Sequence, residues 1–448
     1  METINKKRAN PTLYALPRLG TSIFMGIADF SLLFLYSSAY NLHPLLVGVA
    51  LWSGKIAIAL FQFLFGWISD HTHTKWGRRK PYIFILAPIL SISFIFLLLP
   101  GLILGASATE MQLFIWFLIF NIIFNASYGI TTPYSSWMAE LFTKDERPKV
   151  SGISNIFNII GSGLMAVFSM LVLTGVEDSL VADPSNIPPE LLFPTIIVGI
   201  LLIIFFYITG FGMPVEDTPK YETNMIEDLK RVFRNRNFLR VTLMQGIASI
   251  AWSIIGSQLL VILNDVFVLS QMEFIIIAGT MLLITIAGIM FWKTQIEKIG
   301  RKKTLIRIFM FGIIFTPFTL LGLIRFNSYL LVGIFVIASI TISFGGWQIF
   351  PYIIYADIAE EDKKKDGELK AGSYIGFSAI PLNIFQAFGQ FFSASILALP
   401  ITYQFGAGEG SIGLVLWGPI CAVIFGISIW FSRKFIKLDF SDEEEREV

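Results

Sequence analysis

Residues 69–81 have the sequence SDHTHTKWGRRKP, and the basic turn within it, Gly77-Arg78-Arg79-Lys80, returns 223 positions later as Gly300-Arg301-Lys302-Lys303. Each copy joins two long apolar segments. A second pair of matching elements, Pro133-Tyr134 and Pro351-Tyr352, lies at nearly the same spacing. Two such matches at one period indicate an internal repeat of about half the chain.

The composition shows what kind of chain carries this repeat. Of the 448 residues 55% are hydrophobic and 15% are charged, and the mean hydropathy is +0.71. The apolar residues form blocks of roughly 20, the length that a helix needs to cross a bilayer. An ordinary soluble protein is thereby excluded, and twelve spans are predicted. They are 16–40, 44–68, 82–104, 112–137, 150–174, 191–213, 238–266, 273–292, 304–324, 329–355, 372–400 and 411–435.

The basic residues predict the orientation of the spans. All Lys and Arg except Lys55 and Arg325 fall at one side of the membrane if the N-terminus is cytoplasmic. The positive-inside rule therefore places both termini in the cytoplasm of a multi-pass protein of the cell membrane. No cleavable signal peptide is expected before the first span.

Four regions follow from these spans. Residues 1–213 and 238–435 are predicted to form two six-helix bundles. Residues 214–237, acidic at the start and basic at the end, suit a cytoplasmic linker with a short amphipathic helix. Residues 436–448 are expected to be an acidic, disordered tail. An all-α protein of two parallel six-helix halves is the architecture of major-facilitator transporters.

Several classes of function and site are disfavoured. The lone Cys421 permits no disulfide within the chain and no thiolate metal site, and the net charge is only +1. No separate basic domain suggests nucleic acid. Asp70, His71 and His73 are too weak a pattern for a metal site, so no metal and no cofactor are expected. The chain shows no enzyme motif such as GxSxG or HExxH, and an enzyme is not expected.

Residues 69–81 resemble the loop after the second helix of the glycoside-pentoside-hexuronide (GPH) cation symporters, where D-x-T-x-(T/S)-x-W-G-x-x-(K/R)-P is typical. Further matching stretches are Pro133-Tyr134, Glu140-Leu141, Asp145-Glu146-Arg147, Tyr355 to Asp362 and Gly372 to Phe377. The resemblance implies a major-facilitator fold, alternating access, and import of sugars or glycosides coupled to Na⁺, Li⁺ or H⁺.

The chain departs from the melibiose-type members of that family at their charged positions. Lys55 occupies the basic position of helix 2, but the two carboxylate positions hold Ile58 and Gln62. The acid of helix 4 appears as Thr131 or Thr132, and the lysine of helix 11 as Asn383. These differences make Na⁺ a less favoured coupling ion than H⁺.

Two ionisable residues remain near the middle of the membrane. Asp29 lies 11 residues before residue 40, and Lys55 lies 11 residues after residue 44. Both are therefore about 16 Å below the outer end of their spans. Equal depth on consecutive helices predicts a central ion pair. Three interpretations stay open: proton coupling through Asp29, substrate contact, and a static structural pair.

Amides and aromatic residues at helical spacing predict a sugar site, because they supply paired donors and acceptors and flat apolar surfaces. The alternative is that the amides serve as hydrogen bonds between helices. The candidates are Gln62, Asn121, Asn125, Tyr128, Asn158, Trp252, Asn383 and Gln386.

The two basic turns predict a cytoplasmic gate, in which their cations pair with acids at neighbouring helix ends. The alternative is that these charges only set the topology. The candidates are Asp70, Arg78, Arg79, Glu140, Arg301, Lys302 and Asp357.

These features predict a secondary transporter that moves a sugar or glycoside by alternating access, with H⁺ as the candidate coupling ion. The lipid bilayer is its environment, nucleic acid is not a partner, and a monomer is expected. The alternatives are a lysolipid or amphipathic, drug-like cargo, favoured by the 43 Phe, and an uncoupled facilitator. A receptor or an intramembrane enzyme is the least favoured class.

Overall fold

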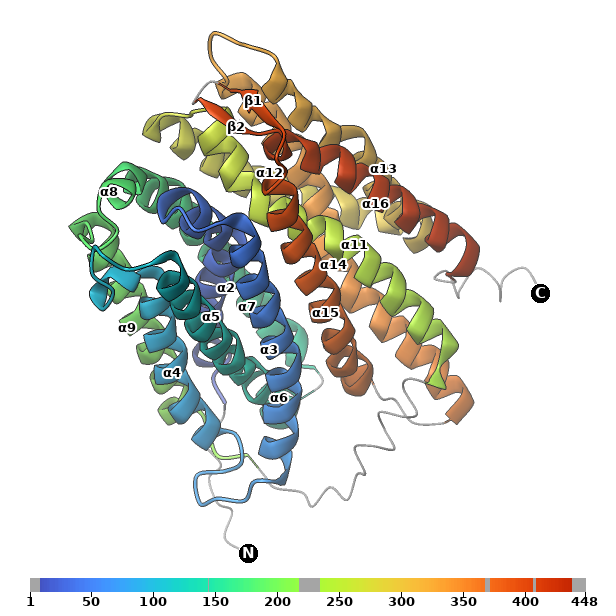
Figure 1. Cartoon of the computed structure of the whole chain (residues 1–448). Coiled ribbons are helices and arrows are strands. Elements are labelled where there is room, and N and C mark those ends of the chain that lie inside the picture. The colour runs from blue at the N-terminus through green and yellow to red at the C-terminus, as the bar shows by residue number, and fades with distance from the viewer. Residues whose placement is uncertain (1–8, 144, 217–233, 367–370, 406–407, 437–448) are drawn as a thin grey trace, which may run out of the picture. The chain divides into compact units, whose positions relative to one another are not determined.

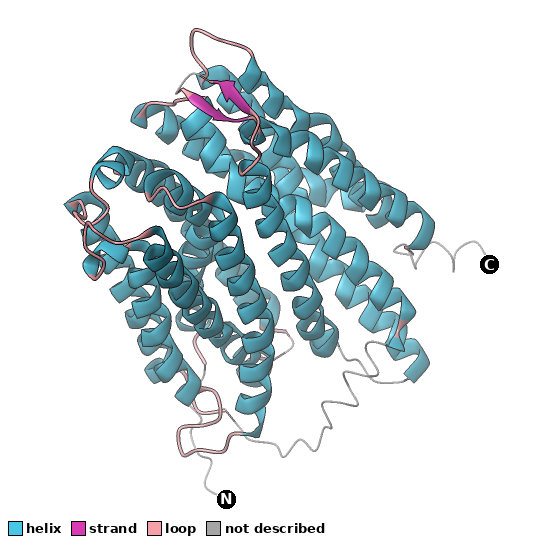
Figure 2. Ribbon diagram, viewed as in Figure 1, coloured by secondary structure: helices cyan, strands magenta, loops and turns pink. Residues whose placement is uncertain are grey.

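The computed structural model describes residues 9–143, 145–216, 234–366, 371–405 and 408–436, without the side chains of Ala139, Pro148 and 351–376. This part of the chain is almost entirely helical (Figures 1 and 2). It contains twelve helical spans that are long and apolar enough to cross a membrane. Each corresponds to one of the twelve predicted spans, which are thereby confirmed.

The chain divides into two compact units, Met1–Glu222 and Thr223–Val448, and the division falls within 214–237. The amphipathic helix predicted there lies largely in 217–233, outside the described residues, as do residues 437–448 of the predicted tail. In the first unit α3 packs along α5, and α2 packs along α7. The helices of this unit are α1 (Pro11–Ala15), α2 (Pro17–Phe34), α3 (Pro44–His71), α4 (Lys80–Leu98), α5 (Glu110–Ser127), α6 (Thr131–Leu141), α7 (Arg147–Val167), α8 (Glu177–Ala182) and α9 (Pro189–Gly212). Short 3₁₀ and π segments are η1 (Leu35–Ala39), η2 (Pro100–Leu102), η3 (Tyr128–Ile130) and η4 (Phe168–Leu173).

In the second unit α11 packs along α15 and α16, and α12 packs along α14. Its helices are α11 (Arg236–Val261), α12 (Gln271–Ile299), α13 (Arg301–Phe315), α14 (Leu330–Asp366), α15 (Ala371–Leu397) and α16 (Gly413–Phe435). The short segments are η5 (Ile262–Val266) and η6 (Thr316–Leu323). An antiparallel hairpin of β1 (Thr402–Gln404) and β2 (Glu409–Ser411) pairs Tyr403 with Gly410.

Local chemistry sets the helix ends. Thr109 with Gln112, and Ser270 with Glu273, form capping boxes that start α5 and α12. At the other end, α12 and α14 continue beyond the predicted limits of 292 and 355, to Ile299 and Asp366. The difference arises because hydropathy marks only the apolar part of a helix, whereas both helices continue with polar turns.

The repeat is visible in the backbone. Gly77 and Gly300 both adopt left-handed conformations, with φ of +92° and +82°, just before α4 and α13. Lys80 Nζ donates to the carbonyl of Met213, 2.8 Å away at the end of α9. Lys302 Nζ donates to the carbonyl of Ile436, 2.6 Å away at the end of α16. In each unit a lysine of the basic turn thus neutralises the negative end of the unit's last long helix.

A second structural repeat was not predicted from the sequence. The first spans of the two units each end in a π segment, η1 and η5, followed by a residue with positive φ. These residues are Asn41, with φ of 51°, and Val268, with φ of 48°. Asparagine tolerates this conformation, but a β-branched side chain is strained in it.

Replacing Val268 by Gly should therefore stabilise the protein, since the strained side chain is half exposed, at 51%, and contributes little packing. We expect the free energy of unfolding to rise by up to about 1 kcal/mol, the left-handed penalty less the entropy of Gly. Thermal unfolding in detergent measures it. Asn41→Gly is the matched control and should change the melting temperature less. A lower melting temperature for V268G than for N41G would contradict the strain at Val268.

Candidate functional site

The two mid-membrane charges lie together. Lys55 Nζ, on α3, is 2.7 Å from Asp29 Oδ1 and 3.0 Å from Asp29 Oδ2, on α2. Among the residues that the structure describes, Asp29 is the hydrogen-bonding and ion-pairing partner of Lys55. Asp29 and Lys55, which lie at equal depth in the predicted spans, thus form an ion pair in the structure. The functional role of this pair stays a prediction.

The two partners differ in exposure. The Lys55 side chain is 5% accessible, whereas the Asp29 side chain is 43% accessible although it lies in the interior of a membrane-spanning helix. The buried cation is therefore paired with a carboxylate that is much more accessible than the cation itself. Removing the charge of Asp29 would leave a buried, uncompensated ammonium group, which typically costs about 3–5 kcal/mol.

The helix that carries Lys55, α3, is held against α5 through its Ala50 and Gly54 positions. Asn121 Nδ2 donates to the carbonyl of Ala50 at 2.7 Å, and Asn125 Nδ2 donates to Asn121 Oδ1 at 2.9 Å. A Cβ at Gly54 would overlap both of these amides, so Gly54 permits the close approach of the two helices. Asn121 and Asn125 thereby orient the segment that presents Lys55.

Other predicted sugar-site residues also bridge helices within the first unit. Gln62 Nε2 donates to Thr131 Oγ1 at 3.2 Å, and Ser22 Oγ lies 2.6 Å from Asn158 Oδ1. The hydroxyl of Tyr128 donates weakly to the carbonyl of Thr21 at 3.4 Å. These contacts are the interhelical hydrogen bonds of the alternative interpretation, and a role of these residues in substrate binding stays a prediction.

Three candidates lie in the second unit. Trp252, on α11, is buried, and its ring centroid is 5.4 Å from that of Phe344 and 5.0 Å from that of Phe425. On α15, Asn383 Nδ2 donates to the carbonyl of Ala379 in its own helix. The backbone carbonyl of Gln386 accepts from Ser253 Oγ at 3.0 Å.

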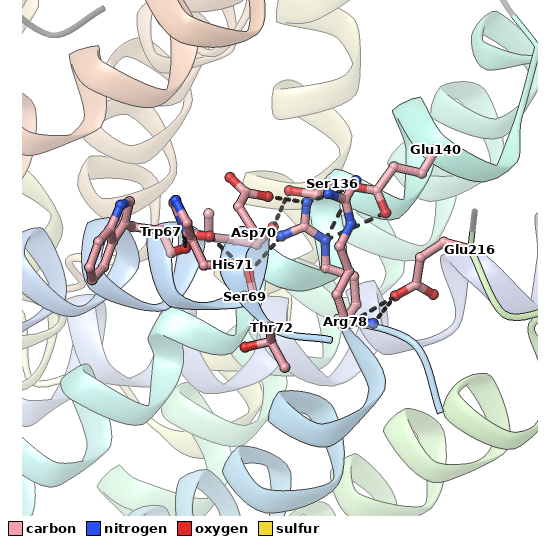
Figure 3. Close-up of polar contacts among 12 residues, drawn as sticks. Trp67, Ser69, Asp70, His71, Thr72, Arg78, Ser136, Glu140 and Glu216 are labelled. Atoms are coloured by element: carbon pink, nitrogen blue, oxygen red, sulfur yellow. Dashed lines mark hydrogen bonds and ion pairs between the residues drawn. The ribbon is translucent and has the colours of Figure 1, made fainter. Parts of the chain in front are cut away.

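The basic turn of the first unit forms a cluster of charges with the ends of α3 and α6 (Figure 3). Arg79 Nη2 is 2.5 Å from both Asp70 Oδ1 and Glu140 Oε1, and Arg79 Nη1 donates to Ser69 Oγ at 2.6 Å. Arg78 Nη2 is 2.7 Å from the same oxygen of Glu140. The structure therefore brings together four of the predicted gate residues: Asp70, Arg78, Arg79 and Glu140.

Arg79 keeps its positive charge at any working pH. Burial lowers the pKa of Arg79, but the hydrogen bonds and charges of Glu140 and Asp70 outweigh it and raise the pKa above its ordinary value. A raised pKa stabilises the fold below the pKa of the unfolded state, and this contribution is lost only above the folded one. Both values lie in strongly alkaline solution, so arginine titration adds no pH dependence near neutrality.

Glu216 completes the cluster and lies outside the set predicted from the sequence. Its carboxylate, 3% exposed, accepts from the backbone N–H groups of Arg78 and Arg79 at 2.5 and 2.8 Å and from Trp137 Nε1 at 3.2 Å. A Cβ at Gly77 would overlap this carboxylate. Glu216 thus caps the start of α4 and connects it to the chain just after α9. The one signal in the sequence is an acid three residues beyond the predicted span 191–213.

The predicted gate residues of the second unit are less fully described. Arg301 and Lys302 open α13, where Lys302 holds the carbonyl of Ile436. Asp357 falls on α14 among the residues whose side chains lie outside the described part. The pairing expected of these three residues therefore stays a prediction.

Comparison with known proteins identifies the family of this chain. The sequence model of the family described as MFS/sugar transport protein matches residues 13–432. The chain belongs to this family. The match covers nearly the whole chain, in agreement with the resemblance carried by residues 69–81.

Individual relatives of this MFS protein are distant. An uncharacterized symporter of Synechocystis sp. is 28% identical over 170 residues, which are 37% of this chain and 31% of the relative. The lactose permease of Lactobacillus helveticus is 23% identical over 256 residues, 53% of this chain and 40% of the permease. The chain thus covers well under half the length of either relative.

A solved structure shows that the fold of this MFS protein is shared. The crystal structure of a D-xylose-proton symporter superposes with a TM-score of 0.69 at 15% identity, covering 96% of this chain and 98% of that chain. At this identity the likeness establishes the fold alone. The predicted fold class, an all-α membrane protein with twelve spans in two halves, is confirmed.

Glu216→Ala should destabilise this MFS protein by about 3 kcal/mol, because three buried N–H groups lose their acceptor. Glu216→Gln keeps one acceptor oxygen and should cost less. Thermal unfolding in detergent at neutral pH compares the two variants with the wild-type protein. Equal melting temperatures for the wild type and E216A would contradict the capping role of Glu216.

Proposed function

We propose that this MFS protein is a secondary transporter that moves a sugar or glycoside by alternating access. The observation that carries the proposal is the accessible carboxylate of Asp29, midway along a membrane span and paired with buried Lys55. A charge facing hydrocarbon at that depth costs several kcal/mol. A carboxylate that is 43% accessible at this depth is explained if its accessible surface faces water, and a solute pathway provides water in the middle of the membrane.

Asp29 is the proposed site of proton coupling. While Asp29 is charged, Lys55 is compensated; when Asp29 takes up a proton, Lys55 is left buried without its counter-charge. Protonation therefore favours a conformation that provides Lys55 with water or another acceptor. Since a proton binds one conformation better than the other, a proton gradient is able to drive the change.

Na⁺ is a less favoured coupling ion. By the resemblance, Gln62 stands at an acid position of the melibiose-type symporters, and Thr131 or Thr132 stands at another. Gln62 Nε2 donates to Thr131 Oγ1 at 3.2 Å, so two neutral side chains meet there. Hard cations prefer several oxygen ligands with negative charge among them. Gln62 and Thr131 supply no charge, which supports coupling to H⁺.

The cargo class rests on the family and on chemistry. The family is described as MFS/sugar transport protein, and its relatives here include a lactose permease. The amide side chains of both units fit the paired donors and acceptors of sugar hydroxyls. We also propose that the cluster of Asp70, Arg78, Arg79 and Glu140 closes the cytoplasmic side in one state, and that a monomer in the cell membrane suffices for transport.

Counterflow in proteoliposomes tests the cargo, because exchange needs no ion gradient. We expect wild-type protein to accumulate labelled sugar against an internal load of the same sugar, with lactose and D-xylose in the first panel. If folded protein exchanges none of the sugars in the panel, the sugar proposal is overturned. Lysolipids and amphipathic solutes would then be tested in its place.

Proton coupling is tested by removing the pair in two steps. Asp29→Asn should keep counterflow but lose accumulation driven by a pH gradient, and it should melt at a lower temperature because Lys55 is left unpaired. Adding Lys55→Met to D29N removes the buried charge and should restore the melting temperature without restoring pH-driven accumulation. Accumulation at the wild-type level in D29N would overturn the role of Asp29.

A further inference from the structure

The interior of the second unit holds buried polar atoms that the protein leaves without hydrogen bonds. Among the described residues, six buried side-chain atoms of this unit have no hydrogen-bond partner: Gln245 Nε2 and Oε1, Trp252 Nε1, Gln258 Oε1, Ser343 Oγ and Ser393 Oγ. Most buried polar groups in folded proteins do have partners. A concentration of exceptions on α11 and its neighbours therefore calls for a physical reason.

Gln245 is the strongest of these cases. Its residue exposure is 0%, and neither its donor nor its acceptor atom has a partner, whereas Gln258 at least donates to the carbonyl of Ser393 at 2.8 Å. A primary amide offers two N–H donors and an oxygen with two lone pairs. Burial of all of these without compensation is costly, and leucine would fit a site of similar volume at no such cost. Stability alone therefore does not account for a glutamine at this position.

Trp252 lies on the same face of α11. Seven residues are close to two turns, so Gln245 and Trp252 project in nearly the same direction, with Cα atoms about 10.5 Å apart along the axis. Trp252 is 7% exposed, and its Nε1 donor is unpartnered. Its ring packs near Phe344, Trp347 and Phe425, which belong to α14 and α16. One face of α11 thus carries an unpartnered amide and, two turns on, an unpartnered indole N–H whose ring lies among aromatic side chains.

We propose that Gln245 is a substrate-binding residue of the second unit, whose amide hydrogen-bonds to hydroxyl groups of a sugar or glycoside, with Trp252 Nε1 as a further donor. This inference rests on the sugar transport proposed above and extends it to two groups on α11. Hydroxyls both donate and accept, so they match the two kinds of unpartnered atom on Gln245. The aromatic rings around Trp252 suit the apolar face of a sugar ring.

The test distinguishes a Gln245 that binds substrate from a Gln245 whose amide is merely buried without a partner. Gln245→Leu removes the polar atoms and keeps the approximate volume, so in the absence of sugar its melting temperature should equal or exceed that of the wild type. Its counterflow should fall roughly tenfold to hundredfold, the loss typical of a buried hydrogen-bonding group. The rise in melting temperature that bound sugar gives the wild type should disappear.

Two further variants complete the design. Thr195→Val is the matched control, because Thr195 Oγ1 on α9 is also buried and unpartnered; it should leave counterflow and the sugar-induced shift intact. Trp252→Phe keeps an aromatic ring and removes only the N–H, so sugar affinity should weaken roughly fivefold at an unchanged melting temperature.

The outcomes are distinct. Wild-type counterflow with an unimpaired Q245L protein would overturn the inference and leave the proposed function standing. A Q245L protein that melts lower than wild type or fails to fold would also overturn it, since the amide would then be held by the protein itself. Folded wild-type protein that exchanges none of the sugars would refute the proposed function and this inference together.

Discussion

Hydrocarbon provides no hydrogen-bonding partner, so every polar group of a membrane-spanning helix has to be satisfied within the protein or by what the protein binds. The first unit follows this constraint at its buried charges. Lys55 is compensated by Asp29, Arg79 by Asp70 and Glu140, and the carboxylate of Glu216 by backbone N–H groups. Removing the compensation of any of these groups would leave a buried charge. A charge in such a place is able to change its state only when its partner changes too.

Much of this arrangement was predictable because it depends on position along the chain. Hydropathy locates spans, since crossing a bilayer sets a minimum apolar length, and all twelve predicted spans correspond to helices in the described part of the chain. The depth of a residue in the membrane also depends only on its position along its span. A count of residues from the helix ends was therefore enough to place Asp29 level with Lys55. The basic turn at Gly77 was recognisable for a similar reason, because its repeat keeps the same spacing as the spans around it.

The remaining features depend on direction and on contacts across the fold, which spacing does not encode. Asn121 and Asn125 have the helical spacing of a polar stripe, but only packing shows that the stripe faces α3 and Gly54. Glu216 reaches Arg78 across 138 positions, and its sequence context is that of a solvated helix end. The π segment before Val268 was not predicted, because its sequence carries no recognised signal for the extra residue in the turn.

The two units resolve the same constraint in different ways, although they share one repeat. The turn after Gly77 uses Lys80 to hold the end of α9, whereas the turn after Gly300 uses Lys302, one position earlier in the repeat, to hold the end of α16. The deeper difference is chemical. The described interior of the first unit contains a charged pair, and its unpartnered neutral atoms are two hydroxyls, those of Ser154 and Thr195. The second unit instead leaves both polar atoms of the Gln245 amide and the Trp252 indole N–H without partners. Charges respond to protons and to the membrane potential, and neutral donors and acceptors match hydroxyl groups. If the first unit carries the coupling and the second provides the recognition on α11, a change of cargo requires no change at Asp29, and a loss of coupling requires none at Gln245.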